Sequence, residues 1–232
     1  MCTSFAWRKD NVLVAMNFDN NGAPFSLSLK DPKQFVVLCG GAPSFGVNSN
    51  GSFVNHLMVN SNGNGLYKRG KNVVHTIKLI TDILSGKLSQ ENINTFLSEK
   101  EVVNVPDNSC HSMITDKIGN VWVAEPGRGI LYSPADESPF YLMTNFSLID
   151  YKASGKIEGS GADRYIISDG LLNKATYLDV ARAFEILEAV KQSEGEWQTA
   201  FSMVYSQKEN AVYYCYNGEF QNIQKYNLNT AI

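Results

Sequence analysis

The chain begins with short apolar runs separated by turn residues, a pattern typical of β-strands. Thr3 to Trp7 and Val12 to Phe18 are joined by Lys-Asp-Asn, and this arrangement predicts a β-hairpin. Three more strands are predicted from later apolar runs, at Phe25 to Leu29, Phe35 to Cys39 and Ser52 to Val59. The first third of the chain is therefore predicted to be antiparallel sheet.

A helical period then replaces the strand pattern. One apolar face is formed by residues spaced four, three and four positions apart, namely Val73, Ile77, Ile80 and Leu84. Ser89 is placed to cap a second short helix with the apolar residues Ile93, Phe96 and Leu97. Two later helices are predicted at Asp163 to Leu172 and Thr176 to Lys191. The inward side of the last helix is predicted to hold Tyr177, Val180, Ala181, Phe184 and Leu187.

Strand patterns return between and after these helices. The predicted strands are Cys110 to Thr115, Val121 to Glu125, Ile130 to Tyr132, Tyr141 to Met143, Thr199 to Tyr205, Ala211 to Tyr216 and Ile223 to Tyr226. The order is thus strands, helices, strands, helices, strands, and hairpin connections dominate. This order favours an α+β fold with helices layered on antiparallel sheets over a series of βαβ units.

Composition narrows the class of protein. The 232 residues suit one domain spanning 1–232, and the net charge of −3 with dispersed Lys and Arg disfavours a nucleic-acid partner. No apolar run is long enough for a membrane helix, and the first residues lack the apolar core of a signal peptide, so we expect a cytoplasmic protein without a membrane partner. The four cysteines are far apart, which predicts reduced thiols and neither a metal nor a cofactor.

Cys2 is the residue with the most suggestive chemistry. A small second residue allows removal of Met1, which would place a thiol and a free α-amine on Cys2. An α-amine has an unperturbed pKa of about 7.7–8.0, so it can accept the thiol proton near neutral pH without a histidine. The predicted hairpin brings Asn17 and Asp19 back beside Cys2, where a carboxylate can orient the amine. The ordinary alternatives are an incidental cysteine and a strand that simply ends in a turn.

These residues resemble a known group of enzymes. Met1-Cys2-Thr3-Ser4 followed by Asn17-Phe18-Asp19 resembles the start of the N-terminal-nucleophile (Ntn) cysteine hydrolases. This superfamily includes the choloylglycine (bile salt) hydrolases, the penicillin V acylases and the acyl-CoA:6-aminopenicillanic acid acyltransferase-like group. Further segments resemble motifs of the family in the same order along the chain, and they are Gly46 to Gly51, Val59-Asn60, Met113 to Glu125, Leu142 to Asn145, Asp163 to Tyr165 and Thr199 to Tyr214.

The resemblance implies a four-layer αββα sandwich and an amidohydrolase that cleaves a linear amide through an acyl-enzyme on Cys2. It implies that Asn60 and Asn145 stabilise the oxyanion, that Asp19 orients the amine, and that Arg164 lowers the pKa of the thiol. Each has an ordinary alternative: a turn residue for Asn60, a helix cap for Asn145 and a solvent-exposed helix residue for Arg164.

The substrate is less well specified than the nucleophile. Asn17, Met16 and Phe146 are candidate substrate-binding residues, with strand and core roles as the alternative for Asn17 and Phe146. Bile salt hydrolases carry an arginine where this chain has Met16, so the resemblance implies an N-acyl amide other than a bile salt. Acyl transfer to an amine, or ligand binding without catalysis, would use the same fold. The oligomeric state is left open, with a homo-oligomer as one alternative.

Overall fold

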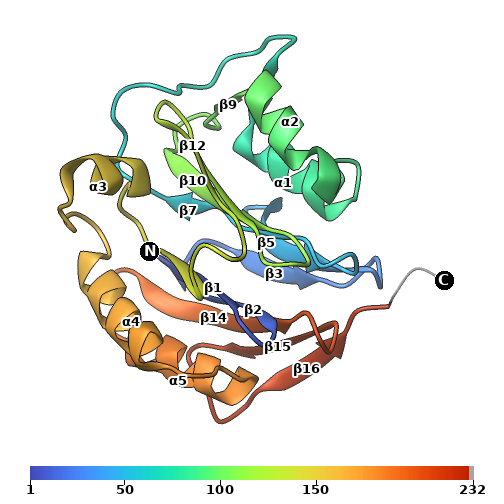
Figure 1. Ribbon diagram of the computed structural model, residues 1–232, viewed down its shortest axis with the longest axis vertical. Coiled ribbons are helices and arrows are strands. Elements are labelled where there is room, and N and C mark those ends of the chain that lie inside the picture. Colours follow the sequence, from blue (N-terminus) through green and yellow to red (C-terminus); the bar gives the residue numbers. More distant parts are fainter. Residues whose placement is uncertain (230–232) are drawn as a thin grey trace.

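A computed structural model describes residues 1–229, and its centre consists of two antiparallel sheets that pack face to face (Figure 1). The first sheet has six strands, and in it the amino-terminal hairpin lies between strands from the second half of the chain. Its strands in spatial order are β13 (Phe140–Met143), β1 (Thr3–Arg8), β2 (Val12–Asn20), β14 (Gln198–Ser206), β15 (Ala211–Tyr216) and β16 (Gln224–Asn227). The amino-terminal hairpin thus lies near the centre of this sheet, where β2 pairs with β14, and β16 forms one edge.

The second sheet has eight strands and comes mainly from residues 25–133. Along its path lie β12 (Gly129–Ser133), β11 (Val121–Glu125), β10 (Cys110–Thr115), β6 (Phe53–Val54), β5 (Ala42–Asn48), β4 (Gln34–Cys39) and β3 (Phe25–Ser28). A short strand, β7 (Leu57–Met58), pairs with the first residues of β10. A separate parallel pair is formed by β8 (Val73–His75) and β9 (Glu101–Val103).

Helices cover the outer faces of both sheets (Figure 1). The eight-stranded sheet is covered by α1 (Thr76–Leu84) and α2 (Ile93–Glu99), and the six-stranded sheet by α4 (Ala162–Lys174) and α5 (Val180–Ala189). A one-turn 3₁₀ helix (Gln90–Asn92) precedes α2, and α3 (Leu148–Ser154) lies between β13 and α4. The three hydrophobic clusters of the molecule fill the three interfaces between these four layers. The predicted αββα sandwich is therefore confirmed.

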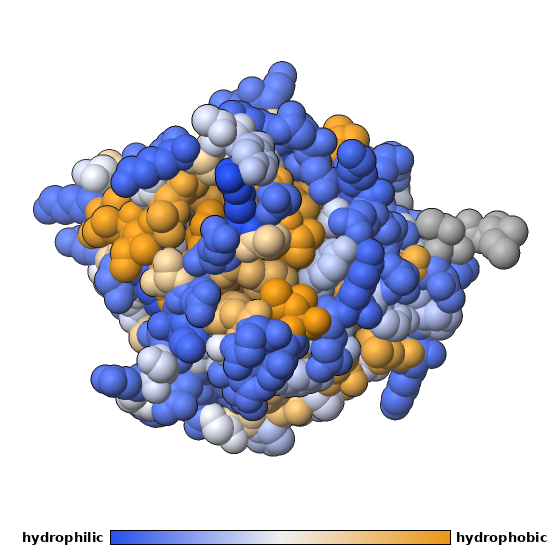
Figure 2. All heavy atoms as spheres, turned by 90° about the horizontal axis from the view of Figure 1, so that it is seen from below, coloured by the Kyte–Doolittle hydropathy of each residue, from blue (hydrophilic) through white to orange (hydrophobic). Residues whose placement is uncertain are grey.

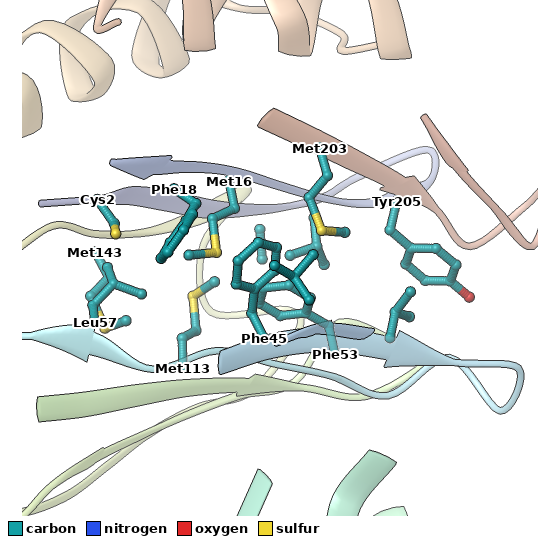
Figure 3. Packing of buried hydrophobic residues seen from close by; sticks show 14 of the residues in the cluster. Cys2, Met16, Phe18, Phe45, Phe53, Leu57, Met113, Met143, Met203 and Tyr205 are labelled. Atoms are coloured by element: carbon teal, nitrogen blue, oxygen red, sulfur yellow. The ribbon is translucent and has the colours of Figure 1, made fainter. Parts of the chain in front are cut away.

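The central layer between the two sheets consists of large apolar side chains. Strand alternation sends every second side chain of each strand inward, which places Met16 and Met203 opposite Phe45 and Phe53 (Figure 3). All four are fully buried, and each such burial contributes about 1.5–3 kcal/mol to folding. Cys2 lies at one end of this layer, so the thiol is placed where the sandwich interior meets the surface.

Three predicted elements differ from the structure. Val73, predicted to belong to the first helix, lies in β8, and α1 begins at Thr76. The strand predicted from Ser52 to Val59 is interrupted at Asn55 and His56, which separates β6 from β7. The helix predicted from Thr176 begins at Val180 instead, because the Asp179 side chain accepts a hydrogen bond from the Arg182 N–H and caps the helix there.

As a consequence, the inward positions predicted for that helix were partly wrong: Tyr177 and Ala181 are exposed, whereas Phe184 and Leu187 are buried as predicted.

The apolar pattern predicts no strand at β5, since Pro43 and Gly46 interrupt it. Gly46 is required there because a Cβ at this position would lie 2.4 Å from the Phe35 carbonyl oxygen on the neighbouring strand. The close approach of the two backbones thus explains why a glycine occupies this position inside a strand. Among residues 1–229, no helix is long and apolar enough to cross a membrane.

Candidate active site

A cavity of about 370 Å³ opens beside Cys2 at one end of the sandwich. Both sheets contribute to its lining: Phe18 and Asp19 come from β2, whereas Met58 and Cys110 come from paired strands of the other sheet. The rest of the lining includes loop residues, among them Pro43, His56, Val105, Asn108, Asn145 and Trp197. The cavity therefore gives the thiol of Cys2 a neighbouring space in which a small molecule can bind.

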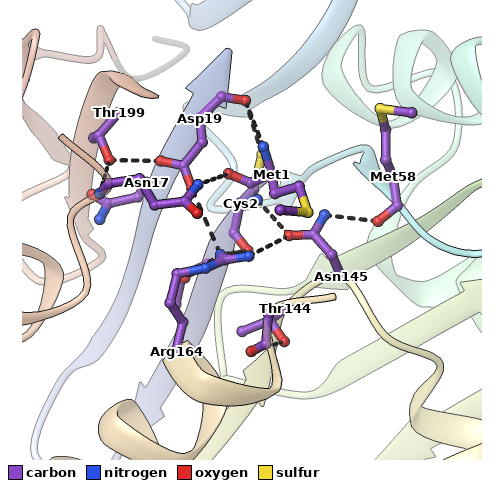
Figure 4. A network of polar contacts seen from close by, with 12 residues as sticks. Met1, Cys2, Asn17, Asp19, Met58, Thr144, Asn145, Arg164 and Thr199 are labelled. Carbon is purple, nitrogen blue, oxygen red and sulfur yellow. Dashed lines mark hydrogen bonds and ion pairs between the residues drawn. The ribbon is translucent and has the colours of Figure 1, made fainter. Parts of the chain in front are cut away.

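Cys2 is held by its backbone. Its nitrogen donates a hydrogen bond of 2.6 Å to Asn145 Oδ1, and its Sγ lies 3.9 Å from the Asp19 backbone oxygen (Figure 4). The side chain is 5% exposed, and this burial raises the pKa of the Cys2 thiol to about 11. The amino-terminal charge, and to a smaller extent Arg164, lower that pKa without cancelling the effect of burial. The thiol is thus protonated at neutral pH in this form of the chain.

Met1 is attached and partly buried. Its amine donates to the backbone oxygen of Asp19 at 3.1 Å, and its carbonyl oxygen lies 3.5 Å from Gln192 Nε2. Burial lowers the pKa of this amine below its usual value of 8.0. Since Met1 forms a peptide bond with Cys2, the Cys2 nitrogen is an amide and cannot accept a proton from the thiol. The reaction predicted from the sequence therefore needs prior removal of Met1.

Arg164 connects three segments of the site from its position on α4. Its Nη1 donates to the Cys2 carbonyl oxygen at 2.5 Å and to Thr3 Oγ1 at 2.9 Å, while Nη2 donates to Asn145 Oδ1 at 2.9 Å. Nη1 also lies 3.6 Å from the Asp19 carboxylate. Arg164 is 3% exposed, so it is not a solvent-exposed helix residue. The guanidinium contacts the backbone of Cys2 rather than its sulfur.

The side chain and the backbone of Asp19 have separate contacts. The carboxylate accepts hydrogen bonds from Thr199 Oγ1 at 2.6 Å and from Gln192 Nε2 at 2.7 Å. Burial raises the pKa of Asp19, and the bonds from Thr199 and Gln192 together with the charge of Arg164 offset only part of that effect. With Met1 present, the backbone oxygen of Asp19, and not its carboxylate, meets the amine.

Asn145 is brought to Cys2, but Asn60 is not. Asn145 follows β13, lines the cavity and donates from Nδ2 to the Met58 carbonyl oxygen at 2.7 Å. Asn60 is exposed and lines a separate cavity of about 130 Å³. The chain turns away from Cys2 after β7, and the Asn60 carbonyl accepts a hydrogen bond from Arg128 Nη2. This position gives Asn60 no contact with the thiol.

The three candidate substrate-binding residues also lie outside the lining of the Cys2 cavity. Asn17 is fully buried and bonds the Leu187 carbonyl of α5 and the Ser202 hydroxyl, because its side chain points to the helical layer. Met16 is fully buried between the sheets. Phe146 packs edge-on against Tyr165 and lines the same separate cavity as Asn60.

Three residues around the site were not among those predicted from the sequence. Thr199 and Gln192 bond the Asp19 carboxylate, and Trp197 lines the cavity. The β2–β14 register pairs Thr199 with Asp19, so aligning these two strands would have indicated the contact. Gln192 and Trp197 precede β14 in a connecting segment that carries no periodic signal. Within the described residues, no group of three or more His, Cys, Asp or Glu side chains is arranged to hold a metal ion.

The chain is similar to known proteins in its structure. Neither a protein-family model nor a curated protein sequence matches the chain. Solved structures do match, including a conjugated bile acid hydrolase from Clostridium perfringens at 16% identity and a TM-score of 0.74, over 98% of this chain and 92% of that one. The chain has the Ntn-hydrolase fold.

Two further structures with this Ntn-hydrolase fold resemble the chain. Penicillin V acylase from Agrobacterium tumefaciens matches at 16% identity and a TM-score of 0.68, over 93% of this chain and 83% of that one. The Caenorhabditis elegans orthologue of N-acylethanolamine-hydrolyzing acid amidase matches at 15% identity and a TM-score of 0.63, over 89% and 93%. At these identities the likeness concerns the fold, and the chemistry has to be argued from the residues of this chain.

Proposed function

We propose that the protein is an Ntn cysteine amidohydrolase that cleaves a linear N-acyl amide. The observation that carries the proposal is the position of Cys2, whose nitrogen and sulfur lie together beside the cavity. Removal of Met1 converts that nitrogen, which is bonded to Asn145 Oδ1, into an α-amine. A nucleophile and a base on one residue then face a space of about 370 Å³.

Acylation proceeds through a tetrahedral intermediate. The Cys2 sulfur attacks the carbonyl carbon of the substrate while the neutral α-amine takes the thiol proton. Asn145 Nδ2 has two hydrogens, of which one is bonded to the Met58 carbonyl, and the other serves the oxyanion. Such a donor is worth about 3–4 kcal/mol in the transition state. The C–N bond then breaks, the α-ammonium returns its proton to the leaving amine, and a thioester remains on Cys2.

Deacylation reverses these proton transfers with water as the nucleophile. The α-amine accepts a proton from water as it attacks the thioester carbonyl, and the C–S bond breaks to release a carboxylic acid. The proton then returns to the Cys2 sulfur, which restores the starting state. Arg164 fixes the Cys2 carbonyl and the Asn145 oxygen during both half-reactions, because its guanidinium bonds both of them.

The lining of the cavity favours an uncharged acyl group. Among residues 1–229, no Lys or Arg lines it and Asp19 is the only carboxylate in the lining, so an acidic acyl group would find no partner. His56 adds no charge at neutral pH, because burial, assisted by the nearby His111, lowers its pKa to about 4. The apolar wall is formed by Phe18, Pro43, Met58, Ile77, Val105 and Trp197. Conjugated bile salts should be among the poorest substrates, since no cation in the lining meets an anionic leaving group.

Intact mass spectrometry combined with a substrate panel tests the proposal. We expect the working enzyme to lack Met1 and to gain an acyl adduct at Cys2 with phenoxyacetyl amides of uncharged amines or with fatty-acid ethanolamides, and to react less with N-acyl amino acids, whose leaving group is anionic. Cys2→Ala should lose both the adduct and turnover, whereas Cys215→Ala, which removes a thiol from the buried layer under the helices, should keep both. Product analysis with an added amine acceptor separates hydrolysis from acyl transfer. Normal turnover by Cys2→Ala would contradict the proposal.

A further inference from the structure

A buried ion pair lies behind the segment that carries Asn145. His111 of β10 and Glu125 of β11 are 0% and 1% exposed, and His111 Nδ1 lies 3.2 Å from Glu125 Oε1. Neither residue lines the Cys2 cavity. A fully buried carboxylate and imidazole are costly to keep in a protein interior unless they are paired and fully hydrogen-bonded. The contacts of this pair therefore indicate what it holds in place.

Both ring nitrogens of His111 have acceptors. Nε2 lies 2.8 Å from the Thr144 backbone oxygen, which can only accept, and Nδ1 faces the Glu125 carboxylate. Glu125 also accepts hydrogen bonds from the Leu148 N–H at 2.8 Å and the Ser147 hydroxyl at 2.5 Å. Burial raises the pKa of Glu125, but the bonds and charge of His111, with those from Ser147 and Leu148, lower it further than burial raises it.

The bonded groups lie on both sides of Asn145 in the sequence. His111 holds the carbonyl of Thr144, immediately before Asn145, and Glu125 holds Ser147 and Leu148, shortly after it. The short segment between these anchors contains Asn145, whose Oδ1 accepts the bond from the Cys2 nitrogen. A charged pair anchored on the β10–β11 hairpin, in the eight-stranded sheet, thus fixes a loop that belongs to the other sheet.

We propose that His111 and Glu125 are positioning residues that set the location of the Asn145 amide relative to Cys2. They touch no reacting atom and act through the backbone of residues 144–148. The inference rests on the proposed function, because positioning matters only where Asn145 takes part in turnover. A displacement of about 1 Å at a reacting group can cost about a hundredfold in rate, so loosening these anchors should lower kcat.

Glu125→Gln tests the pair, because it removes the charge and keeps the shape. We expect kcat of the processed enzyme to fall about 10–100-fold while KM changes less than about threefold, since neither Glu125 nor His111 lines the cavity and the apolar lining is unchanged. Amide hydrogen exchange at residues 144–148 should quicken about tenfold or more. The matched control is Asp116→Asn, a buried carboxylate at the other end of the same hairpin that bonds Ile118 and Asn120. It should change kcat less than about twofold.

A second pair of variants serves if Glu125→Gln does not fold. His111→Gln keeps an N–H donor that can reach the Thr144 carbonyl, whereas His111→Leu has none, so the Gln variant should retain more of kcat at a similar KM. Equal loss in both variants, or a Glu125→Gln enzyme with faster exchange and unchanged kcat, would overturn the inference. Hydrogen exchange needs no turnover, so it reports on the loop separately. If instead Cys2→Ala stays active, the proposed function fails.

Discussion

The wall of the cavity that carries Cys2 and the wall opposite it consist of different kinds of residue. The first, the nucleophile wall, consists of Cys2, Asp19 and Asn145, and all three are connected by hydrogen bonds to Arg164, Thr199, Gln192 or each other. The second, the facing wall, comes from the eight-stranded sheet, the start of α1 and the segment after β9, and it consists of Cys39, Pro43, His56, Met58, Ile77 and Val105. Its side chains are mainly apolar, with a hydrogen bond between His56 Nε2 and Thr76 Oγ1.

This difference suits the two walls to different tasks, one to bond cleavage and the other to selection of the acyl group. A side chain held by several short hydrogen bonds has one position, which suits groups that must meet a reacting atom. Apolar side chains such as Met58, which is 43% exposed, can be exchanged with little loss of folding free energy. We therefore expect the nucleophile wall to determine whether the bond is cleaved and the facing wall to determine which acyl group fits. The following predictions test that division.

Replacing Arg164 should give the largest effect. Arg164→Met leaves the buried Asp19 carboxylate without its cation and the Asn145 oxygen without one donor, so we expect a loss of about 3–5 kcal/mol in unfolding free energy. Urea denaturation measures this loss. Lys68→Met is the control, because Lys68 and its partner Glu101 are both more than half exposed, and it should change stability by less than about 1 kcal/mol. Similar losses in the two variants would show that the nucleophile wall is not specially rigid.

Changing Met58 should have an intermediate effect that appears in selectivity. Met58→Ala removes side-chain volume from the facing wall and so enlarges the cavity. We therefore expect kcat/KM for a long N-acyl amide to rise about 3–10-fold relative to a short one. Competition between two acyl amides of different length measures this ratio directly. Leu66→Ala, which trims an exposed side chain outside the cavity, should leave the ratio unchanged. An unchanged ratio in Met58→Ala would mean that the acyl group lies elsewhere.

A third prediction concerns His56 and pH. Burial keeps the pKa of His56 at about 4 in the folded protein, against about 6.5 when unfolded. Between these values the unfolded chain binds more protons, so stability falls as the pH drops from 6.5 towards 4. His56→Gln removes this contribution and should lose less stability between pH 7 and pH 4.5 than the wild type. Thermal unfolding at both pH values measures the difference, in which the titrations of Asp19 and Glu125 cancel. Parallel losses in both proteins would contradict the assignment.

The elements were largely predictable because they rest on local patterns, whereas the four-layer sandwich was implied by the family resemblance. Alternation and turn residues located the hairpins, and the spacing of Ile77, Ile80 and Leu84 located α1, although Val73 lies in β8. The errors lie where a long-range contact or a cap overrides the pattern. Gly46 lies inside a strand because a neighbouring backbone approaches it, and Asp179 starts α5 later than the apolar spacing predicts. Such contacts are set by the assembled fold, so the local sequence carries little sign of them.

The candidate site was predictable to a smaller degree. Cys2, Asp19, Asn145 and Arg164 lie together in the structure, and the roles assigned to them remain predictions. Asn60 lies elsewhere because its place depends on where the chain turns after β7, and a periodic pattern does not encode that turn.

Met16 and Asn17 lie on the strand paired with β1, and Phe146 follows Asn145, yet none of the three lines the Cys2 cavity. Met16 packs deeper between the sheets, whereas the Asn17 side chain points to the helical layer. Neighbouring residues on a strand face opposite sides, so closeness in sequence does not place two side chains in one cavity.

The pairing of β14 with β2 also determines when the first sheet can be completed during synthesis of the chain. Thr199 bonds Asp19 across 180 positions of sequence, so this contact waits until nearly the whole polypeptide has been synthesised. At 5–20 residues per second the interval is roughly ten to forty seconds. During that time Met1 is open to an aminopeptidase, whereas in the folded chain its amine is bonded to Asp19 and partly buried. The proposed removal of Met1 therefore has a period available to it before the carboxy-terminal strands complete this sheet.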